Sequence, residues 1–224
     1  MEPSLRAHDP LAQDWVTGAL LLALIVLAAI NRNAPRKWRM LLQAGFRMRM
    51  GRQTLREEMD VQDRNFLGLV VIGIAILALF AWQAVHILGF GAATTYPALL
   101  GLLVGVIVAQ GILTRILAGL ARTEAGATEY LYTGSLLFTL LGLLMQPLVA
   151  LIAFRAEWRW PLVVCGCALT VIALLYRWVR GVWIGLGEGI PARYIILYFC
   201  AAEAAPLLLA IHALRPPIIT TSHL

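Results

Sequence analysis

The sequence predicts an all-α fold, an integral membrane helical bundle of six transmembrane helices with both termini outside. Hydrophobic residues make up 61% of its 224 positions and charged residues only 13%, and the mean hydropathy is +0.81. An ordinary soluble domain is less apolar and far more charged. About 20 apolar residues in a helix cross the hydrocarbon core of a bilayer. Six runs approach or exceed that length: residues 15–30, 66–86, 97–119, 133–154, 160–178 and 194–214.

Positive charge is distributed unevenly around these runs. Cytoplasmic segments of membrane proteins are enriched in Lys and Arg. Of the 18 Lys and Arg residues, all but Arg6, Arg155, Arg159 and Arg215 lie in or beside the first, third and fifth connections between the runs. That side is therefore predicted to be cytoplasmic, which leaves external tails at residues 1–14 and 215–224.

The first run is predicted to be a retained helix rather than a cleaved signal peptide. The tail before it carries Glu2, Asp9 and Asp14 against a single arginine, Arg6. A signal peptide begins with a basic region, so this acidic tail favours a membrane span.

Residues 31–65 are predicted to be a basic cytoplasmic segment. Apolar residues such as Leu41, Ala44 and Met48 recur there at helical spacing, mostly apart from the arginines, which favours an interfacial helix lying against anionic lipid. A juxtamembrane block that only fixes topology and a docking site for a cytoplasmic protein are the alternatives, and no nucleic-acid partner is expected. The basic residues of this segment are Arg36, Lys37, Arg39, Arg47, Arg49, Arg52 and Arg56.

The connection between the fifth and sixth runs is predicted to be a second basic loop at the cytoplasmic surface. It brings together Arg177, Arg180 and Arg193. Its glycines permit tight backbone bends, and Trp178 and Trp183 are expected to anchor it at headgroup depth.

A carboxylate, Glu203, lies inside the sixth run. Its distance from the predicted cytoplasmic end at Tyr194 corresponds to about 14 Å of helix, close to the midplane of the bilayer. An ionised side chain at that depth costs at least about 3 kcal/mol, so Glu203 is expected to be paired, protonated or in contact with water. Pro206, on the same helix face, frees a backbone carbonyl beside it.

The third run offers two polar partners for this intramembrane contact. Gln110 is predicted at the depth of Glu203, and Arg115 nearer the cytoplasmic end, where it either compensates the charge or reaches the interface. Three roles stay open for Glu203: a helix–helix fastener, a proton- or ion-coupling group, and a catalytic acid.

Other chemistry is not indicated. Cys165, Cys167 and Cys200 lie inside predicted spans and are interpreted as packing residues, and the four histidines lack metal-ligand spacing. No Walker loop, nucleophile elbow or metalloprotease motif occurs in the sequence. We therefore expect no metal and no cofactor, and these motifs assign no catalytic residue.

In the stretch RWVRGVWIGLGEGIPARYIILYFCAAEAAPLLL, an arginine-containing turn leads into a helix rich in Tyr, Leu and Cys that carries Glu and then Pro. This stretch resembles the C-terminal part of an uncharacterised inner-membrane family of Bacteroidota, known only as a domain of unknown function. The resemblance implies the inner membrane of a two-membrane bacterium, and it implies no activity, cofactor or partner. The matching positions are Arg180, Gly181, Leu197, Tyr198, Cys200, Glu203, Pro206 and Leu207.

Together these features predict a multi-pass protein of the bacterial inner (cytoplasmic) membrane. The favoured function is a non-enzymatic component or accessory of an envelope membrane complex, with the bilayer and other proteins as partners. A small transporter or proton-coupled unit that uses Glu203 is the first alternative, and a membrane-embedded enzyme acting on lipid is the second.

Overall fold

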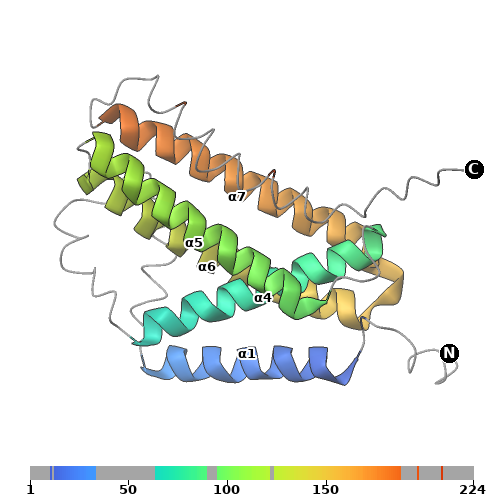
Figure 1. Ribbon diagram of the computed structural model, residues 1–224. Coiled ribbons are helices and arrows are strands. Elements are labelled where there is room, and N and C mark those ends of the chain that lie inside the picture. The colour runs from blue at the N-terminus through green and yellow to red at the C-terminus, as the bar shows by residue number, and fades with distance from the viewer. Residues whose placement is uncertain are drawn as a thin grey trace, which may run out of the picture.

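The computed structural model of the chain describes residues 11, 13–33, 64–89, 95–121, 124–187, 196 and 208. Regular structure within these residues is helical, which confirms the predicted all-α class. Consecutive long helices run in opposite directions (Figure 1). The elements are α1 (Asp14–Asn33), α4 (Arg64–Leu88), α5 (Tyr96–Ala121), α6 (Glu124–Phe154), the 3-10 helix η3 (Ala156–Trp158) and α7 (Arg159–Gly187).

The five long helices are each long and apolar enough to cross a bilayer. The predicted sixth span, residues 194–214, lies outside the described residues, apart from single positions within it. Most of the basic segment 31–65 and of the two tails also lies outside them. Six spans, and the position of both termini outside, therefore stay predictions.

Two helices extend well beyond their predicted spans. The sequence prediction began the fourth span at Thr133 and ended the fifth at Trp178, whereas α6 begins at Glu124 and α7 ends at Gly187. Hydropathy falls where charged and polar residues begin, but backbone hydrogen bonding within a helix can continue through them into the interfacial layer.

Helices α4 and α6 form the centre of the bundle and touch through glycines. A Cβ atom on Gly142 would overlap the backbone of Gly73, and a Cβ atom on Gly73 would lie 3.0 Å from Cα of Thr139. Small residues let transmembrane helices approach closely enough for continuous van der Waals contact. The side chains of Leu79, Met145 and Val149 are at most 2% exposed within this pair.

Glycine also brings α7 against α4. A Cβ atom on Gly166 would overlap the ring of Phe80, which is itself buried. Because the glycine has no side chain, the aromatic ring fills the space at the helix crossing.

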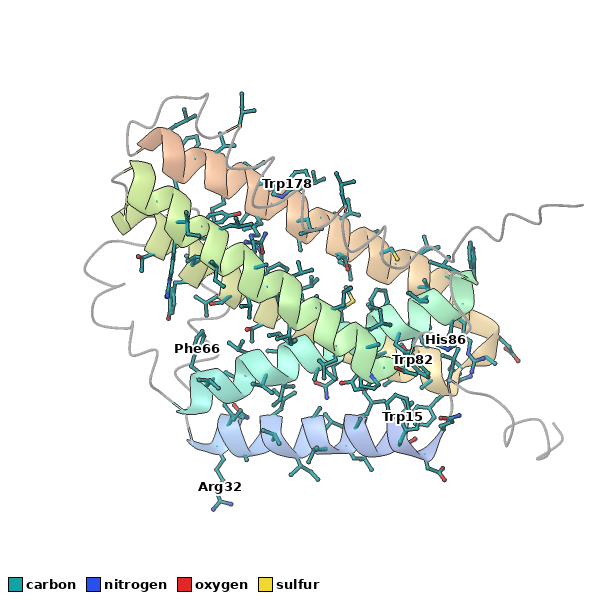
Figure 2. All side chains as sticks on the ribbon, viewed as in Figure 1. Trp15, Arg32, Phe66, Trp82, His86 and Trp178 are labelled. Atoms are coloured by element: carbon teal, nitrogen blue, oxygen red, sulfur yellow. The ribbon has the colours of Figure 1, made fainter. Side chains whose placement is uncertain are left out.

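Aromatic side chains gather at one end of the bundle, which we call the Trp15 end (Figure 2). The ring of Trp15 on α1 lies 5.1 Å from that of Trp82 on α4 and 5.4 Å from that of Tyr96 on α5, measured between centroids. Trp82 also contacts His86 one turn later, at 4.7 Å. Edge and tilted ring contacts of this kind join the ends of three helices.

The opposite end of the bundle, which we call the Arg177 end, holds a second aromatic contact. The rings of Phe66 on α4 and Tyr132 on α6 lie 5.8 Å apart. On α7, Trp160 lies near the Trp15 end and Trp178 near the Arg177 end. The helical rise separates these two tryptophans by about 27 Å, close to the thickness of a hydrocarbon core. Aromatic residues at both levels are typical of a membrane-spanning helix.

Candidate arginine site between two helices

Arg177 and Arg180 lie inside helix α7, where the sequence prediction had placed them in a loop. Each is 4% exposed. A hydropathy profile treats arginine as a reason to end a span, but ionisable residues within membrane helices face the interior of the bundle, where their long stems pack against other helices. Here both side chains turn toward α6.

Arg177 is held by aromatic groups of α6. Its Nε donates a hydrogen bond of 3.1 Å to the hydroxyl oxygen of Tyr130. Its guanidinium carbon lies 5.1 Å from the centroid of the Tyr130 ring and 4.7 Å from that of Phe138. These distances are those of cation–π contacts, which favour a positive charge away from water. The orientation of this guanidinium is therefore fixed by its surroundings.

Gly134 provides the space for Arg177 on α6. A Cβ atom at this position would lie 3.5 Å from the guanidinium carbon, so the planar group lies directly over the glycine. A larger side chain here would compete with the arginine for the same volume.

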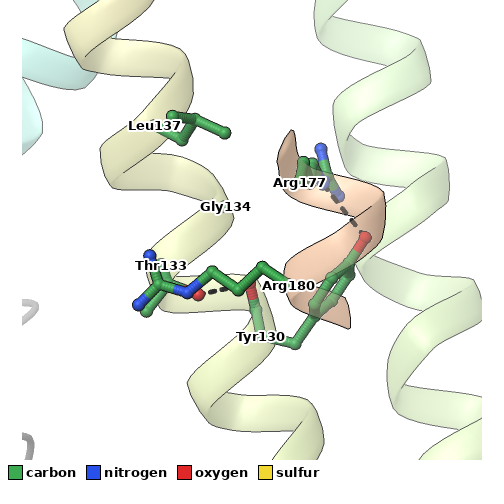
Figure 3. Close-up of a pocket in the computed structure, with 6 residues that line it drawn as sticks. All are labelled: Tyr130, Thr133, Gly134, Leu137, Arg177 and Arg180. Carbon is green, nitrogen blue, oxygen red and sulfur yellow. Dashed lines mark hydrogen bonds between the residues drawn. The ribbon is translucent and has the colours of Figure 1, made fainter. Parts of the chain in front are cut away.

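Arg177 and Arg180 line a small cavity between α6 and α7 (Figure 3). The two arginines stand on successive turns of α7 and reach toward α6. The cavity has a volume of about 10 Å³, room for roughly one water molecule. On the α6 side, Thr133 donates a hydrogen bond of 3.2 Å to the carbonyl oxygen of Tyr130. The cavity is lined by Tyr130, Thr133, Gly134, Leu137, Arg177 and Arg180.

The two predicted partners on α5 differ in exposure. Gln110 is buried, at 7% exposure, on a helix that is otherwise largely exposed, and Thr114 donates a hydrogen bond of 2.7 Å to its carbonyl oxygen. Arg115 is exposed. Glu203, Pro206 and Arg193, as well as the seven basic residues predicted for the interfacial helix, lie outside the described residues, so the contact predicted for Glu203 stays a prediction.

Sequence reasoning did not single out the second buried polar contact, between α4 and α6. Gln83 is fully buried, and its side-chain nitrogen donates a hydrogen bond of 3.2 Å to the carbonyl oxygen of Val149. The acceptor is a backbone carbonyl, which every residue has, so the sequence does not show which residue accepts the bond. Tyr130 was missed because it precedes the predicted start of the fourth span.

One sequence signal does mark the arginine site. The buried positions of α7 include Val163, Gly166, Arg177, Arg180 and Ile184, which recur at intervals that keep them on one helix face. A charged residue in register with small and apolar residues on such a face is a candidate for burial, whatever its hydropathy.

In the described part of the chain, no group of three or more His, Cys, Asp or Glu residues is arranged to hold a metal ion.

At the Trp15 end, Arg159 contacts the end of α6. Its Nε donates a hydrogen bond of 3.1 Å to the carbonyl oxygen of Ile152, one of the last carbonyls of α6.

Helix length, apolar composition and the buried polar contacts define a multi-pass α-helical membrane protein. Residues 16–214 match the family described as a domain of unknown function, DUF4271, and the chain belongs to that family. Neither the curated proteins nor the solved structures contain a match to this chain.

Proposed function

We propose that this protein is a non-enzymatic component or accessory of an envelope membrane complex in the inner membrane of a bacterium. The observation that carries the proposal is the use of buried polar groups as fasteners between helices. Arg177 binds Tyr130 across α7 and α6, and Gln83 binds Val149 across α4 and α6. Such contacts stabilise a fixed arrangement of helices, which suits a structural role.

Two helices offer surfaces on which partner proteins could pack. In each of α5 and α7, only 17% of the most apolar 18-residue stretch, which we call the apolar window, is buried inside the protein. In α4 and α6 about half of it is buried. Exposed side chains on these helices include Val104, Val108 and Val179. In a complex, such faces are available to other transmembrane helices as well as to lipid.

The proposed orientation places the Arg177 end in the cytoplasm. Arg32 at the end of α1 and Arg115 near the end of α5 belong to this end, and the basic segment of residues 31–65 connects two helices there. The positive-inside rule favours this orientation. A reporter that is active only outside the cytoplasm, fused to Leu224, is expected to be active. An inactive but well-expressed fusion would contradict six spans.

The test of the function is purification of the tagged full chain from native membranes in mild detergent. We expect proteins to co-purify in fixed ratio. Gly105→Leu on α5 and Gly18→Leu on α1 form a matched pair, because a Cβ atom added to either glycine would have no neighbour within 4 Å in another helix of the described part of the chain. Loss of a partner in one variant, at unchanged protein level, would locate the interface. Isolation of the chain with lipid alone in several detergents would contradict the proposal.

Ion- or proton-coupled transport is the second candidate, and the burial of Gln110 favours it. A polar side chain that is 7% exposed on the largely exposed helix α5 indicates a polar contact inside the membrane. Glu203 is the proposed coupling group. If it couples, Glu203→Gln abolishes a pH-dependent flux in vesicles while the protein level is kept. A silent Glu203→Gln, combined with loss of the protein in Glu203→Ala, supports the fastener role instead.

A further inference from the structure

A short turn joins α6 to α7 at the Trp15 end of the bundle (Figure 1), and it presents large aromatic side chains outward. Phe154 ends α6, Trp158 ends η3, and Trp160 lies in the first turn of α7. These residues are 58%, 61% and 59% exposed, whereas Trp82 at the same end is 5% exposed. More than half of each residue is therefore available to the surroundings of the protein.

Hydrogen bonds hold this turn in one shape. The backbone N–H of Arg155 donates to the carbonyl oxygen of Leu151 at 2.8 Å, and that of Trp158 donates to the carbonyl oxygen of Arg155 at 3.2 Å. Arg159 Nε donates to the carbonyl oxygen of Ile152 at 3.1 Å, which ties the start of α7 to the end of α6. A preorganised surface loses little conformational entropy when it binds, so the turn can present its aromatic rings at low cost.

Trp160 lies at the end of a lipid-facing stripe on α7. At 3.6 residues per turn, the exposed apolar residues that share its helix face are Val164, Val171 and Leu175. The helical rise places Trp160 about 27 Å from Trp178, which is close to the thickness of a hydrocarbon core. Trp160 is thus placed where acyl chains give way to headgroups.

Charged side chains lie between the aromatic ones. Arg155 and Glu157 are both exposed in the turn. In the acyl region of a bilayer, both charges would be desolvated at high cost. In water, three large aromatic residues would be exposed together. The headgroup layer accommodates both kinds of side chain, because indole rings pack among the lipid carbonyls there and guanidinium groups donate to phosphate oxygens.

We propose that the turn of residues 154–160 is an interfacial anchor that binds phospholipid headgroups. Phe154, Trp158 and Trp160 lie at the level of the lipid carbonyls, and Arg155 donates to a headgroup phosphate. The contact fixes the depth and tilt of α6 and α7, which interfacial aromatic and basic residues set in membrane proteins. The anchor goes beyond the proposed role in a membrane complex, and it holds in either orientation of the chain.

The experiment measures the depth of two tryptophans in the full chain. The protein is labelled with 5-fluorotryptophan and placed in nanodiscs of phosphatidylethanolamine and phosphatidylglycerol. The fluorine resonances are assigned by Trp158→Phe, Trp160→Phe and Trp82→Phe, each of which removes one signal. Paramagnetic broadening is then recorded with a spin label on the headgroup, a spin label near the end of the acyl chain, and a gadolinium chelate that stays in water.

The signals of Trp158 and Trp160 are expected to broaden most with the headgroup label. Trp82 is the internal control, because it is buried at the same end of the bundle and is expected to respond less to all three reagents. Strongest broadening by the gadolinium chelate would place the turn in water, and strongest broadening by the acyl-chain label would place it in the hydrocarbon. Protection from all three reagents would mean that a protein partner or a second copy covers the turn. Each of these three results overturns the proposal.

Arg155→Gln tests the phosphate contact by itself. Its thermal unfolding midpoint is expected to fall by about 2–4 °C in phospholipid nanodiscs, the shift that loss of one interfacial charge gives in a chain of this size. In maltoside micelles, which contain no phosphate, the midpoint is expected to equal that of wild type.

Glu157→Gln is the matched control, because it removes the opposite charge from the same turn. It is expected not to lower the midpoint in nanodiscs. An equal fall for Arg155→Gln in both media would mean that Arg155 supports the fold, and no fall in nanodiscs would mean that it contacts no phosphate. Either result overturns the phosphate contact.

Discussion

Two pairs of helices have similar compositions but differ in how much of their surface is buried. They are the central pair, α4 and α6, and the peripheral helices α5 and α7. The buried share of the apolar window is 56% in α4 and 50% in α6, against 17% in both α5 and α7. Each of the four is apolar enough to span a bilayer. Hydropathy therefore does not separate a helix in the protein interior from one at its surface.

The central and peripheral helices differ in whether their small and polar residues contact another helix. Gly73 and Gly142 face each other across the central pair. Gly101 and Gly105 on α5 have no atom of another described helix within 4 Å of the place where a side chain would begin. The same residue type thus closes a helix crossing in one region and lies on an open surface in the other. In a bilayer, apolar side chains gain little from leaving lipid, so close backbone packing and hydrogen bonds decide which helices associate.

The largest effect is expected from Gly142→Ala, which breaks the central pair. The added Cβ would overlap the backbone of Gly73, and backbone cannot move aside as a flexible side chain can. We expect destabilisation at or above the upper end of the ~1–3 kcal/mol range for overpacking. Thermal unfolding in detergent measures it. Gly105→Ala is the control, and a similar loss there would show that α5 is packed as tightly as α4.

A smaller loss is expected for Gly166→Ala at the crossing of α7 and α4. The added methyl group meets the ring of Phe80 rather than backbone, so part of the overlap can be relieved by movement of that ring. We expect about 1–2 kcal/mol, within the range for overpacking. The double variant Gly166→Ala with Phe80→Leu should recover part of the loss in the same unfolding assay. Failure to recover any of it would argue against this contact.

Tyr130→Phe tests the fastener between α7 and α6. It removes the hydroxyl oxygen that accepts from Arg177 Nε and keeps the aromatic ring beneath the guanidinium. A hydrogen bond to a charged donor contributes about 1.5–3 kcal/mol, and the retained ring contact makes the lower value the expected loss. Unfolding in detergent measures the change. Tyr176→Phe on α7 is the matched control, because the Tyr176 hydroxyl has no hydrogen-bond partner among the described residues. An equal effect there would contradict a specific role for Tyr130.

The smallest effect is expected for Gln83→Leu in the central pair. The change removes the hydrogen bond to the carbonyl oxygen of Val149, but it also removes the side-chain oxygen of Gln83, which is buried and has no hydrogen-bond partner among the described residues. Hydrogen bonds between transmembrane helices contribute about 0.6 kcal/mol on average, and the two changes partly offset each other. A loss of several kcal/mol in the unfolding assay would show that Gln83 has a larger role than a single fastener.

Sequence reasoning reached the helical membrane class because every span has to carry its own apolar length. It did not reach the arginine site, since the arginines themselves were taken as the end of the fifth span. Arg177 and Tyr130 are 47 positions apart, and nothing in their local sequence links them. Gln110 is buried and Arg115 on the same helix is exposed, and the contact predicted between these residues and Glu203 stays a prediction.

The sequence by itself determined that this chain is helical and belongs in a bilayer, because the cost of placing a backbone in lipid allows only long apolar helices of this kind. It also predicts a cytoplasmic end rich in basic residues, which stays a prediction. Only the tertiary structure decided which glycines are contacts and which are open surface, and that Arg177 and Arg180 turn inward. The reason is that packing depends on which helices are neighbours. The sequence of one helix does not say which face of another helix will pack against it.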